Sequence, residues 1–244
     1  MSRYIEVNQI KEGFAELGCE LSDRQAEQFY QYYKLLVETN KVMNLTAITE
    51  FSDVLTKHFI DSCALIKMKD INQCEKIIDI GTGAGFPGIP LKILFPHLRI
   101  TLLDSLNKRI KFLQQVVNEL ELDQVELLHG RAEDYAHQKE YREKYDICVS
   151  RAVANLSTLS EYCIPYVKKG GYFISYKSGK IDEELSKAEY AVSKLGCATE
   201  KVGKINLPST DIERTFVFIK KHSPTSSKYP RKAGMPSKEP LEKQ

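Results

Sequence analysis

The sequence lacks any apolar run of about 18 residues, the length needed to cross a membrane. Its first residues, MSRYIE, also lack the apolar core of a secretion signal, so we expect a cytoplasmic protein without a membrane partner. No C-x-x-C pair occurs, because the cysteines stand singly at positions 19, 63, 74, 148, 163 and 197. We therefore expect reduced thiols, with neither a disulfide framework nor a metal site.

A strong excess of one charge is absent as well, since 35 Lys and Arg stand against 33 Asp and Glu. The basic residues are nevertheless unevenly placed. Residues 220–244 contain seven Lys or Arg and two Glu, which leaves the rest of the chain mildly acidic. A basic tail indicates a polyanionic partner such as a nucleic acid. Charge alone leaves open a second interpretation, in which the tail only improves solubility.

The 244 residues, 42% hydrophobic and 28% charged, have the composition of a globular protein. The length suits one large domain with a small appendage. Residues 1–70 have the apolar spacing of helices, residues 71–220 alternate between strand and helix patterns, and residues 221–244 contain four of the nine prolines. We expect an N-terminal helical cap, an α/β domain that carries the site, and a flexible basic tail that contacts the partner.

Capping signals place the helices of residues 1–70. Ser22 and Gln25 form a candidate capping box at the start of a second helix. Ser52 is a candidate cap for a third helix. The apolar face expected for the second helix comprises Ala26, Phe29, Tyr30, Tyr33, Leu36 and Val37.

Seven strand patterns follow in residues 71–220, with helix patterns between most of them. The strands are expected at 76–80, 99–104, 125–129, 146–150, 172–176, 199–206 and 214–220. Strands that alternate with helices indicate a parallel sheet with right-handed crossovers. The last two strands have no helix between them, so we expect the last strand to be antiparallel.

A glycine-rich loop, DIGTGAGFPG at 79–88, directly follows the first strand. Glycines allow a tight turn and let a ligand approach the backbone. Gly83, Gly85 and Gly88 match the dinucleotide fingerprint, and Asp104 at the end of the next strand could bind ribose hydroxyls, so an NAD-dependent oxidoreductase is one interpretation. The register of Gly81, Gly83 and Gly85 instead resembles motif I of class I S-adenosylmethionine-dependent methyltransferases, whose Rossmann-like sheet has seven strands with the last one antiparallel. The topology favours this second interpretation.

The segment after the fourth strand bears on the methyl acceptor. It reads Ser150-Arg151-Ala152-Val153, without the Asn/Asp-Pro-Pro-aromatic motif of amino methyltransferases. Cys148 lies within an apolar strand and is not preceded by proline, which argues against a cysteine nucleophile. An acceptor that is already nucleophilic, such as guanine N7, would need positioning but neither a protein nucleophile nor an obligatory general base. The residues permit this acceptor without establishing it.

Beyond motif I, several segments in the same order resemble the RsmG (GidB) family, essentially from end to end. They are 40–46 (NKVMNLT), 58–62 (HFIDS), 79–88, 103–109 (LDSLNKR), 131–133 (RAE), 150–152 (SRA) and 228–236 (KYPRKAGMP). The resemblance implies methyl transfer from S-adenosyl-L-methionine to N7 of a guanosine in the 530 loop of bacterial 16S rRNA. It also implies 16S rRNA or the small ribosomal subunit as partner, and we expect a monomer.

The family motifs assign roles to individual residues. By resemblance, Gly81 and Phe86 flank the methionine part of the cofactor, and Asp104 faces the ribose. The cofactor-binding residues expected from the loop and the resemblance are Gly81, Gly83, Gly85, Phe86, Asp104, Ala132, Glu133 and Arg151. Ala132 and Glu133 would line the adenine side, and Arg151 would stand at the mouth that faces the acceptor. The candidate RNA contacts are Asn44, His58, Lys228, Arg231 and Lys232. A non-catalytic RNA-binding module with a vestigial cofactor site remains an alternative.

Overall fold

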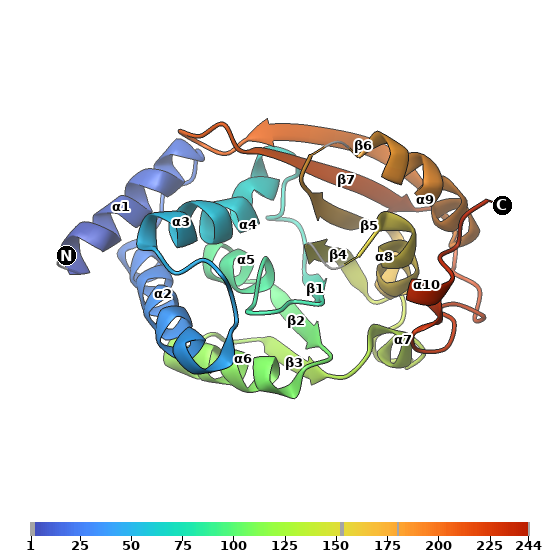
Figure 1. Ribbon diagram of the computed structural model, residues 1–244, viewed down its shortest axis with the longest axis horizontal. Helices are drawn as coiled ribbons and strands as arrows, with labels where there is room; N and C mark the ends of the chain where they lie inside the picture. The colour runs from blue at the N-terminus through green and yellow to red at the C-terminus, as the bar shows by residue number, and fades with distance from the viewer. Residues whose placement is uncertain (1–2, 152–153, 180, 244) are drawn as a thin grey trace.

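The computed structural model describes residues 3–151, 154–179 and 181–243, which are built around one seven-stranded sheet (Figure 1). The strands are β1 (Lys76–Ile80), β2 (Arg99–Asp104), β3 (Val125–His129), β4 (Tyr145–Arg151), β5 (Val167–Lys177), β6 (Cys197–Asn206) and β7 (Glu213–Lys221). Their order across the sheet is β3-β2-β1-β4-β5-β7-β6. Strands β1 to β5 run parallel, and β7 is antiparallel to both of its neighbours, β5 and β6. The predicted parallel sheet with a reversed last strand is confirmed.

The strand order reverses between β1 and β4, in the middle of the sheet. From β1 the chain continues to β2 and β3 on one side, and from β4 it continues to β5 on the other. Strand β1 is buried along nearly its whole length, which explains why it reads as a continuous apolar run rather than an alternating one. Connections that diverge at such a point leave a crevice at the carboxyl ends of the strands, which is where open α/β sheets bind ligands.

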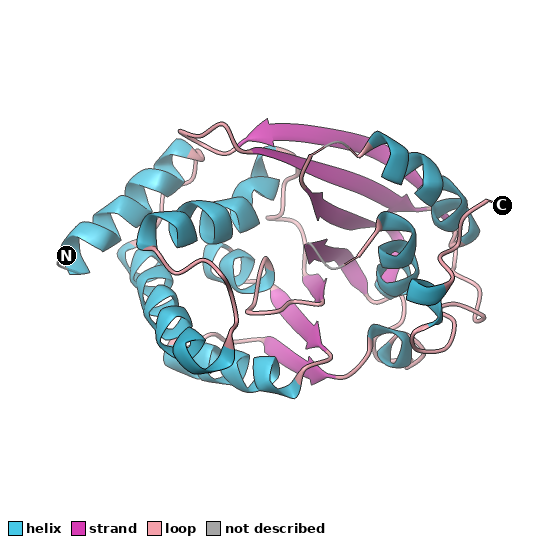
Figure 2. Ribbon diagram, viewed as in Figure 1, coloured by secondary structure: helices cyan, strands magenta, loops and turns pink. Residues whose placement is uncertain are grey.

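Helices cover both faces of the sheet (Figure 2). They are α1 (Arg3–Glu16), α2 (Asp23–Met43), α3 (Phe51–Val54), α4 (Asp61–Cys63), α5 (Gly88–Leu94), α6 (Asn107–Glu119), α7 (Ala132–Tyr135), α8 (Leu156–Cys163), α9 (Asp182–Lys194) and α10 (Met235–Lys238), with short π or 3-10 turns at η1 (Leu55–Ile60), η2 (Ala64–Lys67) and η3 (Ile164–Tyr166). One apolar cluster joins the N-terminal helices, α5 and α6 to one face, and a second joins α7, α8 and α9 to the other. Among the described residues, no helix combines the length and apolar character needed to cross a membrane.

The N-terminal helices share their core with the sheet, because their buried side chains belong to the same cluster as those of β1 and α5. The capping box of Ser22 and Gln25 is confirmed at the start of α2. The buried face of α2 differs from the predicted one. Tyr32 is fully buried, whereas Tyr30 and Tyr33 are only partly buried against the core.

The third N-terminal helix also departs from expectation. It begins at Phe51, with Glu50 as an N-cap that makes no side-chain bond, so Ser52 does not cap it. It then widens into the π-turn Leu55–Ile60, which contains His58. Such turns occur frequently at functional sites because the extra residue redirects a side chain.

The tail is folded onto the domain, which corrects the expectation of a flexible extension. The guanidinium of Arg142 donates to the carbonyl oxygens of Thr225 (2.8 Å), Ser226 (3.1 Å) and Tyr229 (2.9 Å). Further along, Arg231 pairs with Glu161, and the short helix α10 packs near α8. Composition predicted a proline-rich segment without regular structure, but the tail contains the short helix α10, and distant polar groups such as Arg142 bond to the backbone of the tail.

Candidate functional site

A cavity of about 510 Å³ lies at the carboxyl ends of the central strands, at the point where the strand order reverses. Eight of the predicted site residues line it: His58, Gly81, Gly83, Phe86, Asp104, Ala132, Glu133 and Arg151. Thr46, Arg109 and Tyr162 also line it and were not predicted. Thr46 and Arg109 lie inside the segments 40–46 and 103–109. The family resemblance of these two segments was therefore the only feature of the sequence that could have indicated a site role for them.

The glycine loop forms one wall of this cavity. Gly81 and Gly83 adopt left-handed backbone angles, with φ of +71° and +63°, which glycine accepts without strain. The Gly81 N–H donates to the carbonyl oxygen of Leu103 at 2.9 Å, which fixes the loop against the end of β2. A Cβ atom on Gly83 would meet no atom within 4 Å, so the backbone here is open to close approach by a ligand.

Gly85 points away from the cavity, unlike the other two glycines. A Cβ atom at this position would lie 2.6 Å from the Tyr32 hydroxyl, 2.7 Å from Ile89 and 2.8 Å from Leu113. The structure therefore places Gly85 in the packing between the loop and the helices α2, α5 and α6, and not among the residues that line the cavity.

The Asp79 carboxylate fixes the glycine loop through two hydrogen bonds. Its Oδ2 accepts hydrogen bonds from the Thr82 hydroxyl (2.7 Å) and the Gly88 N–H (2.9 Å). Its Oδ1 is buried and has no hydrogen-bond partner among the described residues. Burial raises the pKa of this carboxyl group to about 6. The hydrogen bonds from Thr82 and Gly88 lower this pKa, but the effect of burial is larger.

Asp104 ends β2 with its carboxylate at the cavity wall and only 2% exposed. Oδ2 accepts from the Gly83 N–H at 2.9 Å, and Oδ1 accepts from the Leu106 N–H at 2.9 Å. The Arg109 guanidinium lies 3.1 Å from Oδ2. The carboxylate is thus fixed in place, and its remaining lone pairs can accept further hydrogen bonds.

Ala132 and Glu133 begin the short helix α7 on the opposite wall. The Tyr166 hydroxyl donates to the Ala132 carbonyl oxygen at 2.6 Å and holds the start of the helix. The Glu133 carboxylate is 4% exposed, and its Oε1 accepts a hydrogen bond from the Gly234 N–H of the tail at 2.8 Å. The tail therefore reaches the cavity wall.

At the mouth of the cavity, one carboxylate bridges two guanidinium groups. Arg151 Nη1 lies 3.1 Å from Asp61 Oδ2, and Arg214 Nε lies 2.8 Å from Asp61 Oδ1. The Arg151 guanidinium also lies over the Phe86 ring, 5.1 Å from its centre. Two guanidinium groups share this one carboxylate, so the cluster carries a net positive charge around a buried anion, since Asp61 is only 2% exposed.

His58 completes the mouth. Its ring stacks on Phe86 with centres 4.5 Å apart and a 16° angle between the planes. Nδ1 lies 3.4 Å from Arg151 Nη2, and Nε2 lies 2.9 Å from the Thr46 hydroxyl. Burial and the charge of Arg151 lower the pKa of His58 to about 4, so its imidazole is neutral at neutral pH. Since Nδ1 accepts from Arg151, the hydrogen bond pattern assigns the proton to Nε2.

The remaining candidate RNA residues lie on the surface with different surroundings. Asn44 is exposed and ends α2 in a left-handed conformation with φ of 50°, next to Leu45 at the cavity. Lys228 and Lys232 are exposed and line a second, smaller hollow beside Glu133. Arg231 does not lie free for RNA, because its guanidinium is committed to the fully buried Glu161 carboxylate at 2.7 Å. Ala152, within the 150–152 motif, lies outside the described residues.

The strand order, the reversed β7 and the glycine loop after β1 define a class I S-adenosylmethionine-dependent methyltransferase. The solved structure of an O-methyltransferase family protein from Burkholderia thailandensis shares this fold, with a TM-score of 0.52 at 12% identity, covering 82% of this chain and 72% of that one.

A family model described as rRNA small subunit methyltransferase G matches residues 25–213. The ribosomal RNA small subunit methyltransferase G of Lachnoclostridium phytofermentans is 55% identical over 230 residues, covering 94% of this chain and 95% of that protein. The protein of the same name from Alkaliphilus oremlandii is 53% identical over 232 residues, covering 95% of this chain and 97% of that protein. The chain belongs to the rRNA small subunit methyltransferase G family. The NAD interpretation of the glycine loop is thereby ruled out, and S-adenosylmethionine is the cofactor.

The cavity suits a ligand of this kind. Its volume of about 510 Å³ falls within the range of small-molecule sites. The backbone at Gly83 is open, and the buried Asp104 carboxylate offers acceptors to hydroxyl groups. The lining of the cavity is mixed: apolar side chains such as Phe86 and Leu103 alternate with charged ones such as Asp104 and Glu133, which suits a cofactor with apolar, polar and charged parts.

Proposed function

We propose that this protein transfers a methyl group from S-adenosylmethionine to N7 of a guanosine in the 530 loop of bacterial 16S rRNA, either free or within the small subunit. It would act in the cytoplasm as a monomer. The family membership supports the rRNA substrate. The assignment of N7 as the acceptor atom rests on one observation, which is that the polar side chains at the mouth of the cavity are already hydrogen-bonded to one another.

None of the side chains described at the mouth is poised to remove a proton. The lone pair of His58 Nδ1 faces Arg151 at 3.4 Å, and the pKa of this histidine is lowered to about 4. Both oxygens of Asp61 are bonded to arginines. Guanine N7 has a lone pair and no proton to lose, so such a mouth suits it, whereas an amine or hydroxyl acceptor would ordinarily need a base.

The cofactor supplies a methyl group on a positively charged sulfur. We assign Gly81 and Phe86 to its methionine part, Asp104 to the ribose, and Ala132 and Glu133 to the adenine. Gly83 supplies the open backbone that the ligand approaches.

On the acceptor side, the chain has to bind and orient a base. Arg151, held over Phe86 by Asp61, presents a guanidinium that can donate to O6 of a guanine and leave the N7 lone pair free. Asn44 and His58 are assigned to RNA near the mouth, and Lys228 and Lys232 to RNA phosphates.

Product analysis tests the proposal directly. The protein is incubated with isotopically labelled S-adenosylmethionine and undermethylated small subunits or their 16S rRNA, and the digested nucleosides are identified by mass spectrometry. We expect labelled 7-methylguanosine from one site in the 530 loop. Label on another nucleoside would overturn the acceptor assignment. Cofactor binding without label on either RNA form would favour a non-catalytic RNA-binding module.

A further inference from the structure

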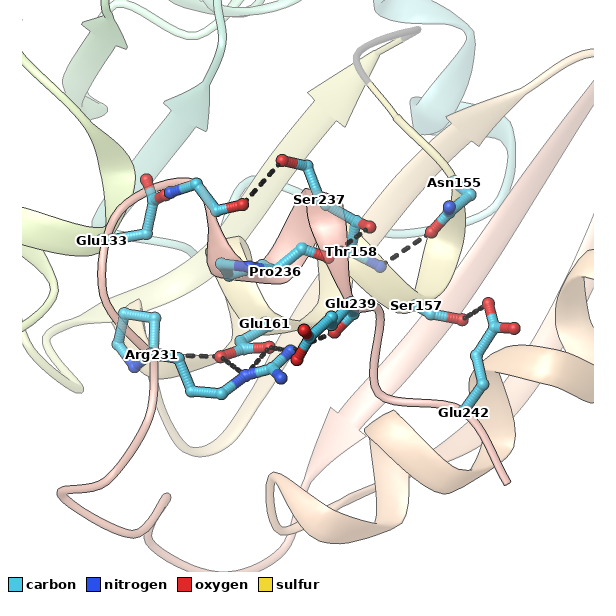
Figure 3. A network of polar contacts seen from close by, with 12 residues as sticks. Glu133, Asn155, Ser157, Thr158, Glu161, Arg231, Pro236, Ser237, Glu239 and Glu242 are labelled. Carbon is cyan, nitrogen blue, oxygen red and sulfur yellow. Dashed lines mark hydrogen bonds and ion pairs between the residues drawn. The ribbon is translucent and has the colours of Figure 1, made fainter. Parts of the chain in front are cut away.

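The C-terminal strap, which we define as residues 230–242, makes polar contacts with residues of α7 and α8 (Figure 3). It is held by side chains of the domain rather than by regular structure. The Thr158 hydroxyl donates to the Pro236 carbonyl oxygen at 3.0 Å, and the Ser157 hydroxyl donates to Glu242 at 3.0 Å. The strap is therefore an ordered part of the fold, fixed to α8 by specific hydrogen bonds.

The main anchor of the strap is the pair of Arg231 and Glu161. Glu161 lies on α8 with no exposed surface. Its Oε2 accepts from Arg231 Nη2 at 2.7 Å, and its Oε1 accepts from Arg231 Nε at 3.0 Å and from the Arg231 backbone N–H at 2.7 Å. Arg231 Nη2 also donates to the Glu239 carbonyl oxygen at 2.7 Å, which closes the strap around this point. Removing Arg231 would leave the Glu161 carboxylate buried without its partner, which would strongly destabilise the fold.

Three residues beyond this anchor, the strap touches the cofactor cavity. The Gly234 N–H donates to Glu133 Oε1 at 2.8 Å, and Glu133 lines the cavity. Gly234 has φ of +84°, a left-handed conformation that favours glycine, and it is the N-cap residue that precedes α10. The carboxylate of Glu133 therefore takes its position from a backbone group 101 residues away in the sequence.

We propose that the C-terminal strap is a positioning element of the cofactor site. Arg231 fixes the strap to Glu161, and Gly234 then holds the Glu133 carboxylate through Oε1, while Oε2, which has no hydrogen bond to any described residue, would accept one from the ligand. This inference rests on the assignment of Glu133 to the adenine side of the cofactor. Arg231 and Gly234 act through Glu133 and touch no reacting atom, so their loss should change cofactor affinity.

The test measures the Kd of S-adenosylmethionine by calorimetry, with folding checked by circular dichroism. Removing Arg231 alone would strand a buried charge, so the chain without the strap also carries Glu161→Gln, and the chains that keep Arg231 keep Glu161. A chain that ends at Tyr229 lacks the strap, and a chain that ends at Glu239 keeps Arg231 and Gly234 but loses the Ser157–Glu242 contact. We expect the first to bind about tenfold more weakly than the full chain, as for one lost hydrogen bond to a charged group, and the second to bind equally well.

A double-mutant cycle separates positioning from general support. In chains that also carry Glu133→Ala, removing the strap should weaken binding less than about twofold, because the group it positions is already gone. A tenfold loss in both backgrounds would show that the strap acts elsewhere and would overturn the proposal, as would unchanged affinity without the strap. If the shortened chain does not fold, the full chain with Arg231→Gln and Glu161→Gln gives the same comparison, with a loss of about threefold expected only when Glu133 is present. This binding readout is independent of the methyl acceptor, so an incorrect N7 assignment would not affect it.

Discussion

The Tyr32 hydroxyl on α2 donates a hydrogen bond to the Ala84 carbonyl oxygen in the glycine loop, 52 residues further along the chain. Tyr32 is fully buried, and its ring lies 5.4 Å from that of Phe86. Gly85 is what allows this approach, because a side chain there would collide with the hydroxyl. The N-terminal helices thus set the shape of the cofactor loop from outside the cavity.

Two glycines of the loop should respond differently to substitution. Gly85→Ala should destabilise the fold by about 1–3 kcal/mol or more, since it combines a left-handed backbone with contacts below 3 Å. Gly83→Ala meets no neighbouring atom and should cost only the backbone strain of about 1 kcal/mol, but it should weaken cofactor binding. Thermal unfolding and calorimetry on both variants check this, and equal losses of stability would contradict it.

Asp104→Ala should weaken S-adenosylmethionine binding by about 1–3 kcal/mol, because it removes an acceptor for the ligand and the bond that positions Gly83. Calorimetry measures the change. Asp211→Ala, at an exposed position, is the matched control and should bind normally. Unchanged affinity in Asp104→Ala would remove this residue from the site.

Asp61→Asn should lower methyl transfer more than cofactor binding. The amide cannot neutralise Arg151 and Arg214 together, so Arg151 loses its fixed position over Phe86. We expect a fall in kcat of about tenfold or more, the usual effect of a misplaced orienting group. Asp53→Asn, which removes a partly exposed pair with Lys57, is the control and should retain full activity. Equal kcat in both variants would rule out this role.

Acid should remove the stability that neutral His58 contributes. Burial lowers the pKa of His58 from 6.5 to about 4, so the unfolded chain takes up this proton first as the pH falls. The contribution is complete above about pH 6.5 and is lost by about pH 4, a change of at most roughly 3 kcal/mol. Urea unfolding of the protein and of His58→Asn should therefore give stabilities that converge on acidification. A pH-independent difference would contradict the lowered pKa.

The raised pKa of Asp79 has the opposite effect on folding stability, because acidification below about pH 6 favours the folded chain at this group. Its pKa is raised by burial to about 6, so the folded chain binds this proton before the unfolded chain does. Asp79 is present in both proteins of the comparison, so its effect cancels in the difference. His222→Asn, on an exposed histidine, should show the pH dependence of the unsubstituted chain.

RNA binding should depend on salt through Lys228 and Lys232. Replacing both with alanine should lower the slope of log affinity against log salt by about 1.4–1.8, the value for two lost phosphate contacts. Cofactor affinity should not change, since neither side chain lines the cofactor cavity. An unaltered salt slope, measured by filter binding with 16S rRNA, would remove these lysines from the RNA surface.

Most of the fold could be predicted because it follows from local patterns. Apolar strand runs, glycine after the first strand and the missing helix between the last two strands together specify the sheet and its reversed strand. Within α2, however, helical spacing placed Tyr30 and Tyr33 on the buried face, whereas the structure buries Tyr32 fully and the other two only in part. The loop that meets Tyr32 decides which tyrosine is buried, and that contact spans 52 residues.

The site was predicted where the motifs are contiguous and was incomplete where distant segments meet. The glycine loop, Asp104 and Arg151 lie at strand ends, which local patterns can locate. The bridging role of Asp61 depends on Arg214, 153 residues away, and the fate of Arg231 depends on Glu161, 70 residues away. No spacing rule relates such pairs, so a basic residue in a polar tail could not be distinguished from an RNA contact.

The pairing of Arg231 with Glu161 also has a consequence for biosynthesis. Glu161 is translated 70 residues before its partner, so α8 has to fold, or wait, with an unpaired carboxyl group until the tail emerges. The strap can therefore close over α8 only after Arg231 has been synthesised.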